Sequence, residues 1–182
     1  AKKNKPTNEV AMLIFNKKLS VSPITTHLPL KDVAKNITKH KIFTQVNLIV
    51  DFYKKKFRKI PRIAVTGLNP HCESNLKNFE EKSIISPAIK KLRIKKLNVS
   101  GPFPADTVFM KDNLKKYDVI IGMYHDQVLT PIKTLFGFDA INITLGLPYL
   151  RVSPDHGPNE IMVGKNTSNP RSLMLALKFL DN

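Results

Sequence analysis

Three of the five histidines follow short apolar segments, and their positions suit a shared metal ion. They are His27 in TTHLPL, His71 in GLNPHCE and His125 in MYHDQ. In an open α/β sheet the carboxyl ends of the strands meet at one crevice, so distant sequence positions can share a site. Three neutral imidazoles leave a divalent ion with an open position, as in catalytic sites. A histidine at a strand end is more commonly a hydrogen-bonded structural residue, so spacing alone leaves both interpretations open.

A second set of polar side chains suits an anionic substrate. Lys133, Asn142 and Arg151 follow His125 at intervals of eight or nine residues, after successive strand-like segments. The guanidinium of Arg151 can donate two parallel hydrogen bonds to a carboxylate or phosphate. Asp106, in the loop GPFPAD, is a candidate base or second anchor. Taken alone, each of these is more often a solvated surface residue or a turn former.

The elements that must position these residues alternate between helix and strand. Hydrophobic periodicity predicts helices over 7–19, 44–57, 80–93 and 172–180, and strands over 21–26, 63–65, 118–123 and 140–144. Pro70 stops the loop after the second strand from continuing as helix. Such alternation is typical of a mainly parallel sheet covered by helices.

Composition indicates a folded protein of one domain or two small lobes. The 182 residues are 42% hydrophobic, without a run long enough to cross a bilayer or the apolar core of a signal peptide. The single cysteine, Cys72, excludes an internal disulfide framework and favours a reducing compartment, so we predict a cytoplasmic protein without a membrane partner. The first residue is not Met, which indicates processing or a longer parent chain.

The net charge of +16 raises the alternative of a nucleic-acid-binding module. Only five of the 30 basic residues are Arg, the residue expected where phosphates or bases are recognised bidentately. The lysine clusters flank amphipathic helical patterns, which is typical of solvated helix faces. We therefore predict no nucleic-acid partner.

Several motifs, in this order, resemble the 4-hydroxythreonine-4-phosphate dehydrogenase family of pyridoxal phosphate biosynthesis. They are TTHLPL, GLNPH, GPFPADT, MYHDQ, NITLGLPYLR and DHG, and the resemblance runs from about Val21 to the C-terminus. It implies that the three histidines bind a divalent metal, that Lys133, Asn142 and Arg151 contact substrate, and that Asp106 lies in the active site. It also implies an isocitrate- or isopropylmalate-dehydrogenase-like α/β fold, with a mainly parallel sheet, helices on both faces and an active site in an interdomain cleft. NAD or NADP is the implied oxidant, and the implied assembly is a homodimer with the active site at its interface.

The implied reaction oxidises 4-phosphohydroxythreonine to a 2-amino-3-oxo acid, which decarboxylates to 3-amino-2-oxopropyl phosphate. Asp106 and Lys133 are both candidates for the base, and neither is assigned. Three histidine ligands favour zinc or cobalt over magnesium. A dehydrogenase for another four-carbon phosphorylated acid, threonate or erythronate phosphate, is the alternative.

A last pattern resembles the adenosine-binding loop of β-decarboxylating dehydrogenases. It comprises His156-Gly157-Pro158, Gly164-Lys165-Asn166 and Asn169-Pro170, and it makes His156, Gly157 and Asn169 candidate cofactor contacts. An ordinary glycine-containing turn is the alternative. No G-x-G-x-x-G fingerprint is present.

The resemblance also divides the chain and marks two departures. Residues 1–150 are expected to form the substrate-binding, metal-binding and dimerisation region, and 151–182 to return into the cofactor lobe. The family is about one domain longer at the N-terminus, so the chain resembles its C-terminal portion, and little catalysis is expected from this piece alone. The loop at 72–78 lacks the glycine-rich stretch of the family.

Overall fold

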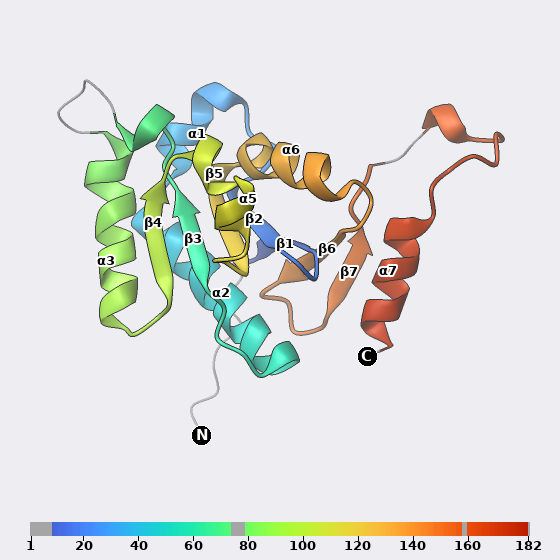
Figure 1. Cartoon of the computed structure of the whole chain (residues 1–182), viewed down its shortest axis with the longest axis horizontal. Helices are drawn as coiled ribbons and strands as arrows, with labels where there is room; N and C mark the ends of the chain where they lie inside the picture. The colour runs from blue at the N-terminus through green and yellow to red at the C-terminus, as the bar shows by residue number, and fades with distance from the viewer. Residues whose placement is uncertain (1–8, 74–78, 158–159, 182) are drawn as a thin grey trace.

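A seven-stranded sheet forms the centre of the computed structural model, which describes residues 9–73, 79–157 and 160–181 (Figure 1). The strands lie in the order β4-β3-β5-β2-β1-β6-β7. Their bounds are β1 Ala11–Phe15, β2 Ser20–Thr25, β3 Ile63–Thr66, β4 Val99–Phe103, β5 Val119–Tyr124, β6 Ile141–Leu145 and β7 Arg151–Pro154. Strands β2 to β6 all point in one direction, because β1 is antiparallel to both β2 and β6; β7 is reversed like β1. The predicted α/β class with a mainly parallel sheet is confirmed.

Helices cover both faces of the sheet, as predicted. One face is covered by α1 Leu30–Asn36, α2 Lys39–Phe57, α3 Ser86–Ile94 and α7 Arg171–Leu180, and the other by α4 Ala105–Val108, α5 Lys111–Leu114 and α6 His125–Phe136. In β5, Val119 and Ile121 join the core under the first set of helices, and Ile120 joins the core under the second. Successive strand residues point to opposite faces, so a central strand covered on both sides is apolar throughout.

The predicted helix over 7–19 is wrong in the described part of that range. Residues 11–15 form β1, and residues 16–19 turn the chain into β2. Leu13 and Ile14 are both buried, one in each core, because β1 lies inside the sheet. A short apolar run buried on both faces cannot be distinguished from a buried helix by periodicity. Residues 7 and 8 lie outside the described residues.

The remaining predicted elements are present, with shifted boundaries. Helix α2 begins at Lys39 rather than near Thr44, because Thr38 caps it by accepting a hydrogen bond from the Lys41 N–H at 3.2 Å. The helix predicted over 80–93 begins as one turn of π-helix, Glu81–Ile85, and continues as α3.

Six elements were missed by the sequence prediction: the helices α1, α4, α5 and α6 and the strands β4 and β7. The motif GPFPAD reads as a loop, yet Gly101 and Pro102 belong to β4. β4 is the edge strand, where a proline costs no ladder hydrogen bond on its open side.

The sheet continues across the predicted boundary at residue 150, since β7 pairs with β6. The division at that residue, and the interdomain cleft, stay predictions. Within the described residues, no helix has the length and apolar character needed to span a membrane.

Candidate metal and substrate site

Two of the three predicted histidine ligands lie side by side at the carboxyl ends of β2 and β5. These strands are parallel neighbours, with Thr25 paired to Tyr124. His27 comes two residues after Thr25 with a positive φ of 46°, and His125 is the first residue of α6. Their ring centroids are 5.5 Å apart, with an interplanar angle of 41°. The structure therefore places these two histidines, which follow separate strands, side by side.

The geometry of this pair suits a shared divalent ion. Zn–N bonds of about 2 Å at tetrahedral angles put the centroids of two ligating imidazoles about 5 Å apart, close to the observed spacing. Asp126 accepts a hydrogen bond from Nδ1 of His125 at 2.7 Å. That bond fixes the ring and leaves Nε2 of His125 for a metal, the usual arrangement of a metal-binding histidine.

His71 lies at the same edge of the sheet on a different loop. It belongs to a 3-10 helix, Pro70–Cys72, that follows β3, and it has a positive φ of 56° and an exposed side chain. Across residues 9–73, 79–157 and 160–181, no three or more His, Cys, Asp or Glu side chains group closely enough to hold a metal. A single chain therefore brings only two of the three predicted metal ligands close together.

A buried carboxylate holds the loop that follows β3. Glu81, 2% exposed, accepts hydrogen bonds from the backbone N–H groups of Leu68 and Asn69, both at 2.7 Å. Its other oxygen accepts a bond from Nδ2 of Asn69 at 2.9 Å. The loop needs Gly67, because a Cβ there would lie 2.8 Å from Glu81 Oε1 and 2.7 Å from the sulfur of Cys72.

Gln127 connects this loop to the start of α6. Its Oε1 accepts hydrogen bonds from the Thr66 hydroxyl at 2.8 Å and from the Met123 N–H at 2.7 Å. Its Nε2 donates to the carbonyl of Gly67 at 2.8 Å. One amide side chain thus fixes the ends of β3 and β5 relative to each other.

Lys133, on α6, forms an ion pair with a buried carboxylate. Its ammonium donates to the Asp155 carbonyl at 2.6 Å and to Asp155 Oδ2 at 3.1 Å. Burial raises the pKa of Asp155, and the charge of Lys133 opposes that shift. The Asp155 N–H donates to the Ser172 hydroxyl at 2.8 Å, which in turn donates to the Ala140 carbonyl at 2.6 Å. The network fixes the position of the Lys133 side chain.

Asn142 and Arg151 lie on the two last strands of the sheet. Alternation along β6 puts Asn142 and Thr144 on the face covered by α6, because Ile143 between them packs in the core of the opposite face. Arg151 pairs with Thr144 and donates to its hydroxyl at 2.8 Å. The Asn142 side-chain oxygen is buried without a hydrogen-bond partner among the described residues. An orphaned acceptor is costly in a protein interior, so it suits a residue that binds a ligand donor.

Asp106 is an exposed residue in the first turn of α4, which follows β4 at the same edge of the sheet. Burial raises the pKa of the Cys72 thiol, and the negative charges of Glu81 and Asp106 add to that effect. Asp106 therefore lies near the loop that carries His71.

The three candidate cofactor residues are all exposed. His156 Nδ1 donates to the Gly157 carbonyl at 3.1 Å, and the His156 ring lies 6.3 Å from that of Phe138. A Cβ on Gly157 would meet nothing within 4 Å, so the surface there is open. Asn169 Oδ1 accepts a hydrogen bond from the N–H of Arg171, the first residue of α7. The cofactor roles of these residues stay predictions, and Pro158 lies outside the described residues.

Comparison with known proteins decides the family. Residues 2–180 match the model of PdxA, the pyridoxal phosphate biosynthetic protein. The chain belongs to the PdxA family. A 4-hydroxythreonine-4-phosphate dehydrogenase from Sulfurihydrogenibium sp. (strain YO3AOP1) is 47% identical over 172 residues, covering 93% of this chain and 53% of the relative.

Solved structures of PdxA proteins share the fold. The chain superposes on a putative 4-hydroxythreonine-4-phosphate dehydrogenase from Salmonella typhimurium with a TM-score of 0.80 and 37% identity, covering 94% of this chain and 53% of the other. For the enzyme from Klebsiella pneumoniae the TM-score is 0.81 and the identity 36%, with coverages of 95% and 55%. The chain spans about half the length of these PdxA relatives.

Three positioning residues of this PdxA chain escaped the sequence analysis: Glu81, Gln127 and Asp155. Gln127 and Asp155 lie inside two of the motifs that resemble the family, MYHDQ and DHG, beside histidines that were predicted as site residues. Glu81 lies in a predicted amphipathic helix, where a glutamate is expected to face solvent. No sequence pattern predicts that Glu81 is buried inside a π-helical turn.

Replacing Glu81 with Ala in the PdxA chain is expected to lower the free energy of unfolding by about 2–4 kcal/mol, because two part-buried N–H groups lose a charged acceptor. The metal affinity is expected to fall about tenfold, as it does when outer hydrogen-bond partners of metal sites are lost. Urea unfolding and a zinc titration measure the two effects. Glu80→Ala is the matched control, since Glu80 accepts one hydrogen bond, from Asn69 Nδ2 at 2.9 Å. Unchanged zinc affinity in Glu81→Ala would show that this carboxylate does not position the loop.

Proposed function

We propose that the full-length protein is a metal- and NAD(P)-dependent dehydrogenase that oxidises 4-phosphohydroxythreonine in pyridoxal phosphate biosynthesis. The observation that supports this most is the pairing of His27 with His125 at neighbouring strand ends, in a chain of the PdxA family. His125 and Lys133 are eight residues apart on α6, which puts them on similar sides of the helix about 12 Å apart. That spacing suits a substrate held by its hydroxyl at one end and by its anionic group at the other.

The chain's own residues would bind and orient the substrate. Lys133, held in place by its ion pair with Asp155, donates a hydrogen bond to a carboxylate or phosphate. Arg151 keeps guanidinium donors for the same anion beyond the one bound to Thr144. The orphaned oxygen of Asn142 accepts a hydrogen bond from a substrate hydroxyl or amine.

The base for the hydroxyl proton is best assigned to Asp106. Lys133 donates both of its observed hydrogen bonds to Asp155, so its nitrogen is already engaged as a donor. Asp106 accepts no hydrogen bond from another described residue and its carboxylate is exposed. When bound, a divalent metal would supply Lewis acidity at the histidines, and NAD or NADP would accept the hydride.

We further propose that the active site is completed by a second subunit. His71 is exposed and lies apart from the His27–His125 pair, although all three are at one edge of the sheet. In a homodimer with a two-fold axis at this edge, His71 of one subunit approaches the pair of the other, twice per dimer. We also propose that the bound metal is zinc, cobalt or magnesium and that the protein is cytoplasmic.

The experiment that tests this function is a turnover assay on the full-length protein. With zinc or cobalt and either NAD or NADP, 4-phosphohydroxythreonine is expected to give stoichiometric reduced cofactor. The value of kcat/KM should exceed those for the phosphates of threonate and erythronate. A higher kcat/KM for either of those acids would assign the chain to another substrate of the same class.

A further inference from the structure

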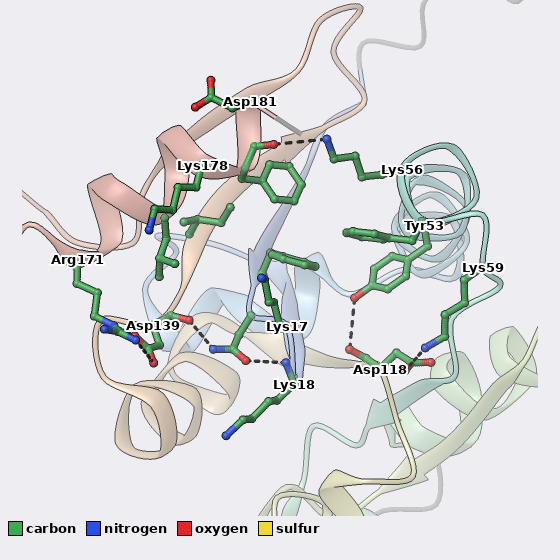
Figure 2. A pocket seen from close by; sticks show the side chains of 16 residues that line it. Lys17, Lys18, Tyr53, Lys56, Lys59, Asp118, Asp139, Arg171, Lys178 and Asp181 are labelled. Atoms are coloured by element: carbon green, nitrogen blue, oxygen red, sulfur yellow. Dashed lines mark hydrogen bonds and ion pairs between the residues drawn. The ribbon is translucent and has the colours of Figure 1, made fainter.

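A pocket lies at the amino ends of β5 and β6, at the opposite ends of the parallel strands from the histidine pair. Its volume is about 880 Å³. The pocket opens where β1 ends and where β5 and β6 begin, between the C-terminal end of α2 and helix α7. Figure 2 shows Arg171 and Lys178 on one side, Tyr53 and Lys59 on the other, and Lys17 and Lys18 between them.

The floor of this pocket is aromatic. Phe15 and Phe57 stack with centroids 5.4 Å apart at 12°, and Phe179 lies 5.2 Å from Phe15. Tyr53, 6% exposed, lies beneath, with its hydroxyl 3.0 Å from that of Ser20. Burial raises the pKa of Tyr53 to about 12, so the floor carries no charge at neutral pH. Phe57 is 37% exposed, so part of its ring stays accessible to a ligand.

The rim carries an excess of positive charge. Six of the lining side chains are cationic and three are acidic. Of the acids, Asp118 is paired with Lys59 and Asp139 with Arg171, and Asp181 adds one further negative charge. Lys17 and Lys18 form no ion pair with any described residue. Asn16 fixes the turn that carries the two lysines. Its Nδ2 donates a hydrogen bond to the Asp139 carbonyl, and its Oδ1 accepts one from the Lys18 N–H.

Lys56 is a third cation of the rim that forms no ion pair with a described residue. Its ammonium lies 4.7 Å from the centre of the Phe179 ring and 3.4 Å from the Phe179 carbonyl, and a neutral acceptor leaves its charge in place. The cation is thereby held directly beside the aromatic floor.

We propose that this pocket binds a small phosphorylated compound with an aromatic ring, at a site separate from the substrate site. The volume lies within the range of small-molecule sites. The stacked phenylalanines offer a face to a planar ring, and Lys17, Lys18 and Lys56 offer charge to a phosphate. A nucleic acid strand fits less well, because the aromatic surface lies in a concave pocket rather than along an open groove.

Phenyl phosphate, titrated into the full-length protein by calorimetry and by NMR, tests this proposal. We expect phenyl phosphate to bind more tightly than inorganic phosphate or phenol, with amide shifts at residues 15–18, 56–59 and 171–179. Lys17→Glu/Lys18→Glu is expected to weaken binding at least about tenfold, with the loss shrinking at high salt. Phe57→Leu keeps apolar volume but removes the ring, and should weaken phenyl phosphate roughly threefold while leaving inorganic phosphate unchanged.

The matched control is Lys111→Glu/Lys115→Glu, which makes the same charge change at the two ends of α5, over the other face of the sheet. It should leave binding unchanged. Equal weakening in the two double variants would reduce the effect to net charge and overturn the proposal. So would shifts confined to the histidine edge of the sheet, or tighter binding of single-stranded RNA than of phenyl phosphate.

Discussion

Replacing His71 with Ala in the full-length protein is expected to remove the bound divalent metal and to lower kcat at least about 1,000-fold. Loss of one of three protein ligands weakens the binding of the metal ion. Without the ion, kcat falls because Lewis-acid stabilisation of the developing charge is worth several kcal/mol. Metal analysis of the purified protein and steady-state kinetics measure both effects. His40→Ala is a matched control, because His40 is an exposed histidine of α2 paired with Glu9. Wild-type metal content in His71→Ala would disprove the three-histidine site.

Mixing two inactive variants tests whether the site is shared between subunits. In a heterodimer of His71→Ala with His125→Ala, a shared arrangement leaves one site intact, with His27 and His125 from one subunit and His71 from the other. Free subunit exchange then restores about a quarter of wild-type activity, because half of the dimers are mixed and each mixed dimer has one intact site out of two. If all three ligands came from one subunit, every site would lack a ligand and no activity would return.

Replacing Lys133 with Met is expected to lower kcat/KM for the phosphorylated substrate by about 100- to 1,000-fold. The substrate loses a charge-assisted donor, and the buried Asp155 carboxylate loses its partner. The unpaired carboxylate should also reduce the free energy of unfolding by about 1–2 kcal/mol, since the lysine is 43% exposed and the pair is partly screened. Kinetics and urea unfolding measure these effects.

A double variant separates the two roles of Lys133. Lys133→Met/Asp155→Asn removes both charges, so it is expected to recover most of the lost stability without recovering kcat/KM. Recovery of kcat/KM in the double variant would mean that Lys133 has only a structural role. Lys133→Arg keeps a cation near Asp155 and should retain more activity than Lys133→Met.

The sequence by itself determined the α/β class and about half of the helices and strands, and it supplied the candidate site residues. Strand and helix runs such as 63–65 and 172–180 are readable because burial on a sheet or beneath a helix face imposes a local apolar period. The motifs around His27, His71 and His125 are local strings, so their resemblance to the family could be read without knowing how the chain folds.

Tertiary structure decided which of these residues meet. His27 and His125 are neighbours because β2 and β5 pair in parallel, although 98 residues separate the histidines in sequence. The strand β1 was mistaken for a helix, because its burial on both faces depends on helices packed from elsewhere in the chain.

The positioning residues Glu81, Gln127 and Asp155 also became visible only in three dimensions. Each acts through hydrogen bonds to distant backbone or side-chain groups, and a sequence pattern records the type of a residue but not its partner. Sequence determines which groups are available for chemistry; the pairing of strands and the burial of polar side chains determine which of them act together.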